Sequence, residues 1–376
     1  MSKIEAVKIH PIAAPLKRAQ RTAFEPRKDV TLILVEVVTD DGLIGYGQVS
    51  STPMKDIVPW IEKFAAVITG MDALAYTAVW EKMFRLTSPQ PDGGGGMSRD
   101  KRPQIMGAIG GIDMALWDIA GKAANKPIFR LLGAENVPVF TYATGGYYRE
   151  GEKLTACADE LAGFVANGYK AVKLKTASGP LKDEVQRIKA TRAAIGSDVQ
   201  LMLDMNAAYD LATCIEFAHA VAPYDITWLE EPLHWYLQPN DFLRLAQASP
   251  IPLAHGEREM TRFTARNFVA SGAVRYMQFD ATRYAGMTEA LRVAHMADQH
   301  GVLISPHHAP ELHCHLVAAF PRCGHSVESH GSHERDPIWQ GMYTDRAEIR
   351  DSYVYMNEKP GWGYEVEWDF VRKHIA

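Results

Sequence analysis

Two rhythms of hydrophobic and polar positions divide the chain into distinct parts. In the first third, alternating apolar runs predict strands, and Asp40-Asp41-Gly42 supplies the turn residues of a hairpin. Helical periodicity follows, interrupted by a loop of glycines at 93–96. The predicted elements are strands at 3–13 and 30–49 and helices at 55–69, 74–86 and 107–125. We therefore predict an N-terminal α+β domain over residues 1–130.

From residue 137 the pattern changes to short buried runs that alternate with amphipathic helical stretches. The predicted strands lie at 139–142, 171–174, 199–203, 226–229, 251–254, 274–279, 302–304 and 325–327. Strands that alternate with crossover helices indicate a parallel barrel, so the predicted fold class is α/β with a catalytic barrel domain over 131–330. The segment 331–376 is rich in Pro, Gly and aromatic residues, holds a short strand at 353–356, and is expected to pack back on the first domain.

The composition is that of an ordinary globular protein, with 47% hydrophobic and 23% charged residues. A net charge of −5 gives no electrostatic footprint for nucleic acid or an anionic membrane surface. No run approaches the ~20 apolar residues of a membrane span, and charges interrupt the first apolar stretches. The four cysteines form no CxxC pair. We expect a cytoplasmic homo-oligomer with reduced thiols and no nucleic-acid or membrane partner.

Polar or charged residues end seven of the predicted barrel strands, at intervals of 21 to 29 residues. These residues are Lys175, Asp204, Glu230, Glu257, Asp280, His307 and Glu328. Each interval equals one strand, loop and helix unit. Active sites of such barrels lie at the carboxyl ends of the strands, so the seven side chains are expected to meet in one mouth.

Three successive strands end in Asp204, Glu230 and Glu257. A single carboxylate there can simply cap the next helix, but three in register offer hard oxygen ligands with open positions for water and substrate. Mg²⁺ fits such a site best, with Mn²⁺ as a possible substitute.

Lys173 and Lys175 lie on the same side of their strand, facing the barrel interior. Burial and mutual repulsion are expected to lower the pKa of a lysine there toward neutrality, which allows it to act as a base. A solvated pair at a strand end is the alternative. Across the mouth, Asp280 is placed to orient His307 and raise its basicity. Glu328 is expected to donate a hydrogen bond to a substrate carboxylate if burial raises its pKa.

Histidines outside this set have plainer interpretations. His308, His313 and His315 are predicted to be structural. A zinc hydrolase on the same barrel needs a His-x-His at the end of the first strand, where this chain has residues 141–146 without histidine. The pair His313 and His315 falls in a predicted helix, where residues two apart do not share a face.

The order of these motifs resembles the mandelate racemase branch of the enolase superfamily over essentially the whole chain. The matching segments are Lys173-Leu174-Lys175, Asp204-Met205-Asn206, Trp228-Leu229-Glu230-Glu231-Pro232, Gly256-Glu257, Asp280, Pro306-His307 and Glu328. The resemblance implies a capping domain, completed by the C-terminal segment, over a modified TIM barrel of the (β/α)7β type. His255 departs from the family pattern, in which many members have a small residue, and is a candidate substrate contact.

The resemblance also implies roles for the strand-end residues. The implied metal ligands are Asp204, Glu230 and Glu257, and the acid/base groups on opposite substrate faces are Lys175 and the His307–Asp280 dyad. Lys173 and Asn206 match substrate-binding positions, and Glu328 a catalytic, substrate-contacting one. A divalent ion, Lys173 and Glu328 together can offset the charge of an enediolate formed when a carboxylic acid loses its α-proton.

The fate of that enediolate leaves two reactions open. If a hydroxyl lies on the next carbon, expulsion of water gives a 2-keto-3-deoxy acid, so dehydration of a sugar acid (an aldonate or aldarate) is our first hypothesis. Racemisation or epimerisation is the alternative, because it also needs two bases on opposite faces. Polar and charged residues before the second strand weakly favour a polyol substrate, although solvated loop charge explains them equally well; they are Arg18, Arg21, Thr22, Arg27 and Lys28. A non-catalytic binding module is disfavoured because every proton-handling position is filled.

Overall fold

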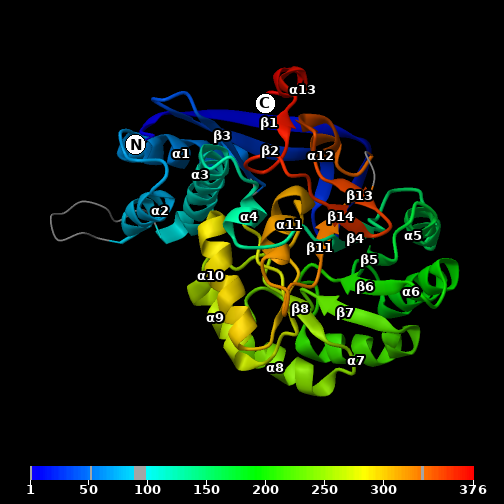
Figure 1. Ribbon diagram of the computed structural model, residues 1–376. Coiled ribbons are helices and arrows are strands. Elements are labelled where there is room, and N and C mark those ends of the chain that lie inside the picture. The colour runs from blue at the N-terminus through cyan, green and yellow to red at the C-terminus, as the bar shows by residue number, and fades with distance from the viewer. Residues whose placement is uncertain (1, 51–52, 89–98, 332–333) are drawn as a thin grey trace.

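The molecule has two stacked parts, an N-terminal α+β domain above a barrel (Figure 1). The computed structural model describes residues 2–50, 53–88, 99–331 and 334–376. The predicted glycine loop at 93–96 lies outside these ranges. Within them, each helix is too short or too polar to cross a membrane.

The N-terminal domain is an antiparallel sheet covered by helices. Its strands are β1 Ile4–Arg21, β2 Pro26–Thr39 and β3 Ile44–Val49, and its helices are α1 Met54–Ile68, α2 Tyr76–Arg85, η1 Arg99–Lys101, α3 Arg102–Ala123 and α4 Ile128–Leu131. β1 and β2 pair far beyond the predicted strands, to Arg21 opposite Pro26, after an irregularity that follows Pro15. The predicted strands were too short because the residues near the hairpin tip are mostly polar and show no hydrophobic alternation. Backbone pairing between strands does not require buried side chains.

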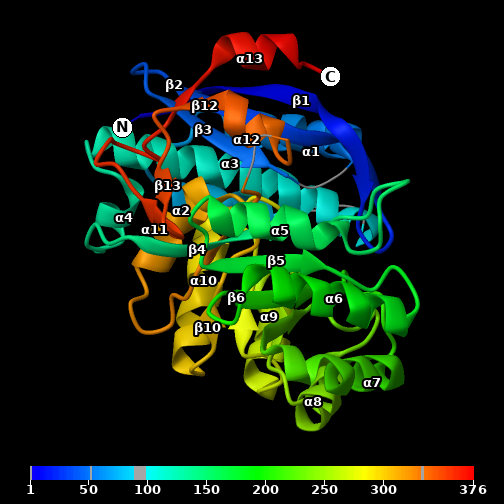
Figure 2. The ribbon, with the colours of Figure 1, turned by 90° about the vertical axis from the view of Figure 1, so that its right-hand side faces the viewer.

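The long β1–β2 hairpin extends from the capping domain to the barrel and contacts it. Its tip bends down beside the loop that follows β4 (Figure 2). Arg21 and Tyr148 exchange backbone hydrogen bonds of 2.9 and 3.0 Å, which tie the hairpin to that loop. Arg18 and Arg21, predicted to lie in a loop, therefore belong to a strand.

Helix α3 connects the two parts and is buried on every side along most of its length. Every residue from Ile105 to Gly121 is buried, as expected for a helix enclosed by other elements. It packs against β3 on one side and α10 on the other. Gly47 of β3 allows the close approach, since its Cα faces the backbone of Gly111 and Ala115.

The barrel contains all eight predicted parallel strands. They are β4 Val139–Gly145, β5 Ala171–Lys175, β6 Gln200–Asp204, β7 Ile226–Glu230, β8 Leu253–His255, β9 Tyr276–Met277, β10 Leu303–Ile304 and β11 Val327–Ser329. The helices between them are α5 Ala156–Ala166, α6 Leu181–Ile195, α7 Leu211–Val221 with η2 Ala222–Tyr224, α8 Pro239–Ala248, α9 Arg262–Ser271, α10 Gly286–Gln299 and α11 Pro310–Ala318. Pairing of β11 with β4 closes the ring, with Glu328 opposite Tyr142. The fold is thus a modified (β/α)7β barrel with an N-terminal capping domain.

The C-terminal segment completes the capping domain (Figure 1). Its elements are α12 Pro337–Met342, β12 Tyr343–Thr344, β13 Glu348–Arg350, β14 Tyr353–Tyr355, β15 Glu365–Val366 and α13 Trp368–Lys373. The indole of Trp362 donates to the carbonyls of Tyr46 and Met114, and Ile375 bridges to Ile12. β14 also pairs with β4, so this segment touches both parts of the molecule.

The close packing of α3 on β3 makes Gly47 a sensitive position. A Cβ added there would overlap the Gly111 carbonyl oxygen and lie 2.7 Å from the Ala115 amide nitrogen. We expect Gly47→Ala to lower the free energy of unfolding by about 1–3 kcal/mol, the usual cost of overpacking. Gly163→Ala is the matched control, because exposed Gly163 lies in α5 with nothing within 4 Å, and it should stabilise by up to about 1 kcal/mol. Urea unfolding followed by circular dichroism measures both, and equal effects would contradict the packing argument.

Candidate active site

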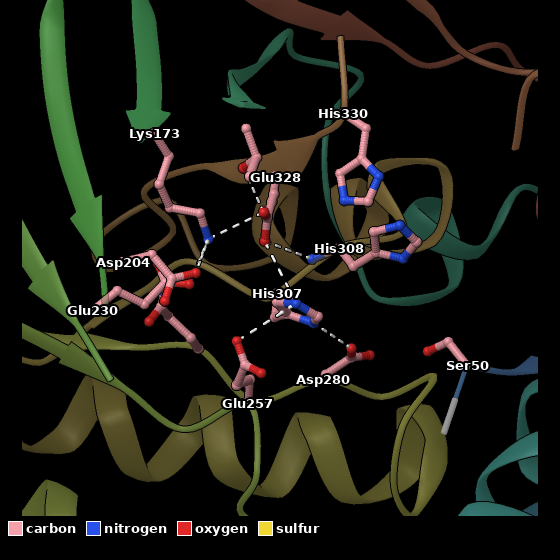
Figure 3. A network of polar contacts seen from close by, with 12 residues as sticks. Ser50, Lys173, Asp204, Glu230, Glu257, Asp280, His307, His308, Glu328 and His330 are labelled. Carbon is pink, nitrogen blue, oxygen red and sulfur yellow. Dashed lines mark hydrogen bonds and ion pairs between the residues drawn. The ribbon is translucent and has the colours of Figure 1, made fainter. Parts of the chain in front are cut away.

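The barrel strands bring the predicted polar residues to one mouth (Figure 3). Lys175, Asp204 and Glu230 are the last residues of β5, β6 and β7. Glu257, Asp280 and His307 follow β8, β9 and β10 within a few residues, and Glu328 lies in β11. A cavity of about 470 Å³ opens onto this set and is lined by Lys175, Asn206, Glu257 and His307 among others.

Three carboxylates form the base of the mouth. Oxygen atoms of Asp204, Glu230 and Glu257 lie within 4.8 Å of one another, and all three side chains are buried. Oε2 of Glu257 and Oδ1 of nearby Asn206 have no hydrogen-bond partner. Buried oxygens without donors are costly, so this cluster has the oxygen donor set and the unsatisfied acceptors that fit a hard divalent cation.

Both lysines of β5 are paired with these carboxylates. Lys173 Nζ bonds Glu230 and lies 3.0 Å from Oε1 of Glu328 and 3.7 Å from Oδ2 of Asp204. Lys175 Nζ bonds Asp204. The lysines are therefore separated by shared anions and do not simply face one another.

The prediction that the lysine pKa values are lowered is wrong for this arrangement. Burial lowers the pKa of Lys175, but the adjacent Asp204 carboxylate outweighs it, and the pKa is raised above its ordinary value. Burial likewise opposes the charged form of Lys173, but Glu230 and Glu328 raise its pKa well above the ordinary range. The argument from sequence counted the repulsion between two ammonium groups and missed the stronger attraction of carboxylates on the neighbouring strands.

The expectation for Glu328 is also wrong in sign. Burial raises the pKa of Glu328, yet Lys173 and His307 outweigh it, and the pKa lies well below its ordinary value. Its Oε1 accepts from the Thr144 hydroxyl, and its Oε2 accepts from the His308 amide at 3.2 Å. Glu328 is thus an ionised acceptor here, not a hydrogen-bond donor.

His307 and Asp280 form the expected dyad. Nδ1 of His307 lies 2.7 Å from Oδ2 of Asp280 (Figure 3). The other oxygen of Asp280 accepts from the amide and hydroxyl of Thr282, each at 2.8 Å. Burial raises the pKa of Asp280, but the hydrogen bond from His307 outweighs it and holds that pKa below its ordinary value. Nε2 of His307 faces the mouth, 3.5 Å from Oε2 of Glu257.

Several residues that support the carboxylates were missed from the sequence. The Gln278 amide donates to Oε2 of Glu230 at 2.6 Å, and the Trp228 indole donates to the same oxygen at 3.1 Å. Arg283 pairs with Glu257 at 2.5 Å. For Trp228 and Gln278 the sequence did offer a sign. Each lies two residues before a strand-end residue, Glu230 or Asp280, and therefore points to the same inward face of its strand.

Residues of the capping domain, of the loop after β10 and of the chain after β11 form the rim of the cavity. They are Gln20, Glu25, Pro26, Arg27, Asp29, Ser50, His308, His330 and Arg335. The Ser50 hydroxyl lies 2.6 Å from that of Thr282, which ties the capping domain to the loop after β9. Of the charged residues predicted before the second strand, Arg27 reaches the cavity, whereas Arg18 pairs with Glu152 and Arg21 bonds Ser178.

The other histidine predictions have mixed outcomes. His313 and His315 are buried. Each accepts a hydrogen bond from a backbone amide, that of Ala281 and that of Phe129 respectively, which agrees with a structural role. His308, expected to be structural, instead lines the cavity. His255, a candidate substrate contact, faces away from it and packs between the rings of Phe242 and Phe268.

His308, His330 and Asp336 form another group with ligand atoms within 4.8 Å of one another. Burial lowers the pKa of His308, but Asp336, 3.0 Å from its Nε2, outweighs burial and raises the pKa to about 9. His308 is therefore protonated at neutral pH and bound to an anion.

Comparison with known proteins identifies both parts of the chain. Residues 3–133 match the N-terminal domain of the mandelate racemase / muconate lactonizing enzyme family, and residues 156–370 match the enolase C-terminal domain-like family. Arabinonate dehydratase of Saccharolobus solfataricus is 29% identical over 89% of this chain and 88% of its own. D-galactarolactone cycloisomerase of Agrobacterium fabrum is 32% identical over 81% and 78%. The crystal structure of a racemase from Streptomyces coelicolor A3(2) with bound magnesium superposes with a TM-score of 0.88 at 25% identity, covering 99% of this chain and 100% of that one.

The pairing of His308 with Asp336 predicts a pH dependence of stability. The pKa of His308 is raised when the protein folds, so its contribution is complete below about pH 6.5 and is lost as the pH rises through about 9. We expect the unfolding free-energy difference between wild type and His308→Asn to shrink by about 3 kcal/mol over this window. Urea unfolding at a series of pH values measures the difference. Parallel pH profiles for the two proteins would contradict the ion pair.

Proposed function

The chain belongs to the mandelate racemase / muconate lactonizing enzyme family of the enolase superfamily, and we propose that it dehydrates a sugar acid to a 2-keto-3-deoxy acid with the help of Mg²⁺. The observation that carries the proposal is a buried cluster of three carboxylates with a lysine and a histidine–aspartate dyad at the same mouth. The substrate class is a small carboxylic acid with a hydroxyl on the α-carbon and another on the next carbon.

Asp204, Glu230 and Glu257 are the residues that would hold the metal, with Mn²⁺ as a possible substitute. A divalent cation bound there supplies positive charge that offsets the charge developing on a substrate carboxylate. The unpartnered oxygens of Glu257 and Asn206 support this assignment. Lys173 and Lys175 would then share the carboxylate oxygens with the cation, which weakens the pull that raises the pKa of Lys175.

Lys175 and His307 are the proposed proton-handling groups. They lie on β5 and just after β10, strands separated by β11 and β4 on one side of the ring and by β6 to β9 on the other. One group takes the α-proton, and the electron pair of that C–H bond enters the carboxylate as an enediolate. The other group gives a proton to the β-hydroxyl, which leaves as water with the electrons of the C–O bond. The resulting enol tautomerises to the keto acid.

Lys173 and Asn206 are proposed to hold the substrate carboxylate, and Glu328, which is ionised here, keeps the Lys173 ammonium in place through a contact of 3.0 Å. Lys173 is charged and fully enclosed, so its interaction with a developing anion is strong and needs no reorganisation. Asp280 keeps the imidazole of His307 oriented, with Nε2 toward the mouth. Proton transfer by a positioned group contributes ~10²–10⁴-fold, so this electrostatic stabilisation must supply much of the remaining acceleration.

Racemisation or epimerisation of an α-substituted acid is the second candidate. It is favoured by the same observation, because two acid/base groups on different sides of the mouth can remove a proton from one face and return it to the other. Incubating the enzyme and Mg²⁺ with a library of mono- and diacid sugars separates the two. Keto-acid formation supports dehydration, and inversion of the α-carbon without keto acid supports the alternative.

The carboxylate cluster predicts strict metal dependence. Chelation should abolish turnover and Mg²⁺ should restore it, since three carboxylates without a cation repel one another. Glu230→Gln should lose both metal binding and turnover. Glu231→Gln is the matched control, because neighbouring Glu231 pairs with Arg258 and lies outside the cluster. Metal content and activity are measured together, and full activity after exhaustive chelation would refute the assignment.

Replacing Lys175 and replacing His307 are expected to block different steps of the reaction. For a substrate whose α-proton faces Lys175, Lys175→Ala should stop exchange of that proton with deuterated solvent. His307→Asn should stop loss of water yet allow exchange, because the enediolate can return its proton when no acid assists the hydroxyl. Nuclear magnetic resonance of substrate and product measures both rates. Wild-type exchange and dehydration in both variants would rule out the two-group mechanism.

A further inference from the structure

Arg335 is a buried cation with incomplete hydrogen bonding. It is 3% exposed, and its Nη1 pairs with Oε1 of Glu160 at 2.7 Å. Among the described residues, its Nε and Nη2 have no hydrogen-bond partner. Leaving donors of a buried charged group unpaired costs more than leaving neutral ones unpaired, so these two nitrogens call for a partner that this part of the chain does not provide.

Arg335 lines the same cavity as the proposed catalytic groups, and on its other side it lines a smaller pocket with Arg149 and Glu160. Arg335, Lys175, Asn206 and His307 all line the larger cavity. The ring of Tyr147 lies between the two cations, with its centroid 4.0 Å from Cζ of Arg335 and 5.5 Å from Nζ of Lys175. The guanidinium is therefore close enough to Lys175, one of the two proposed proton-handling groups, for one small molecule to contact both.

The local charge balance leaves Arg335 able to bind a further anion. Glu160 is shared, because Arg149 also pairs with it, at 3.1 Å. Arg149 also lies 3.7 Å from Glu152, whereas among the described residues Arg335 pairs with Glu160 alone. His308 and Asp336 on the same rim neutralise each other, since they are paired at 3.0 Å.

We propose that the free Nε and Nη2 edge of Arg335 binds the second carboxylate of a diacid, which makes the substrate an aldarate and not an aldonate. This inference rests on the proposed function. The two donors lie side by side in one plane and match both oxygens of a carboxylate, whereas a terminal hydroxyl engages one of them well. With C–C bonds of about 1.5 Å, an extended chain of about six carbons can reach from the α-carbon near Lys175 to this edge.

The test compares aldarates with aldonates of the same configuration, such as galactarate with galactonate, which differ only at the far carbon. With Mg²⁺ present, wild type should have a higher kcat/KM for the aldarate. Arg335→Gln should lower the kcat/KM for the aldarate about 100-fold more than that for the aldonate, the usual effect of losing a charged hydrogen-bonded pair. Arg335→Lys keeps the charge but not the paired donors and should lose about 10-fold.

Arg149→Gln is the matched control. It removes the other guanidinium from Glu160, but Arg149 is not among the described residues that line the cavity. It should leave the ratio of aldarate to aldonate kcat/KM unchanged. The inference is overturned, with the proposed function intact, if wild type uses both acids equally, if Arg335→Gln impairs both equally, or if Arg149→Gln has the same effect as Arg335→Gln.

A failure of the proposed function is distinguishable from a failure of this subsite. If wild type converts no sugar acid, calorimetric binding of the same aldarate and aldonate with Mg²⁺ still tests Arg335. Aldarate affinity that exceeds aldonate affinity and disappears in Arg335→Gln supports the subsite. Equal affinities, or no binding of the aldarate, refute it.

Discussion

Burial of like charges in the barrel mouth is the constraint on which the rest of the site depends. Asp204, Glu230, Glu257 and Glu328 are all enclosed at the ends of the strands, where isolated carboxylates are very costly. The chain tolerates them because cations come from neighbouring strands and loops. Removing any one member therefore leaves an uncompensated charge, and the cluster acts as a unit.

This constraint also explains why the lysines carry raised pKa values in a site proposed for proton abstraction. Lys173 and Lys175 lie beside the carboxylates, and the attraction of these anions keeps both lysines protonated. In the proposed mechanism, a base at position 175 would become available when a metal ion takes over the neutralisation of Asp204. Metal binding and the protonation state of the lysine would then be coupled through the oxygens they share.

The capping domain and C-terminal segment turn this charged mouth into an enclosed cavity. The long β1–β2 hairpin, Ser50 and the chain after β11 reach the rim from three separate parts of the sequence. α3 and Trp362 hold these parts in place by packing the sheet against the barrel. Enclosure strengthens every electrostatic interaction inside, and it places the rim, with Arg335, beside the proposed substrate.

The sequence by itself determined the barrel and the positions of its strand-end residues. Both follow from local periodicity, because strands of a parallel barrel are buried runs and their last residues share one face. The tertiary structure alone decided the sign of the pKa shifts at Lys175 and Glu328, the length of the hairpin, the outward packing of His255 and the unpaired edge of Arg335. Each of these depends on a partner on another strand or in another domain, such as Asp204 for Lys175 and Tyr148 for the hairpin. Electrostatic energy depends on distance in space, and hydrophobic periodicity along the chain does not specify that distance.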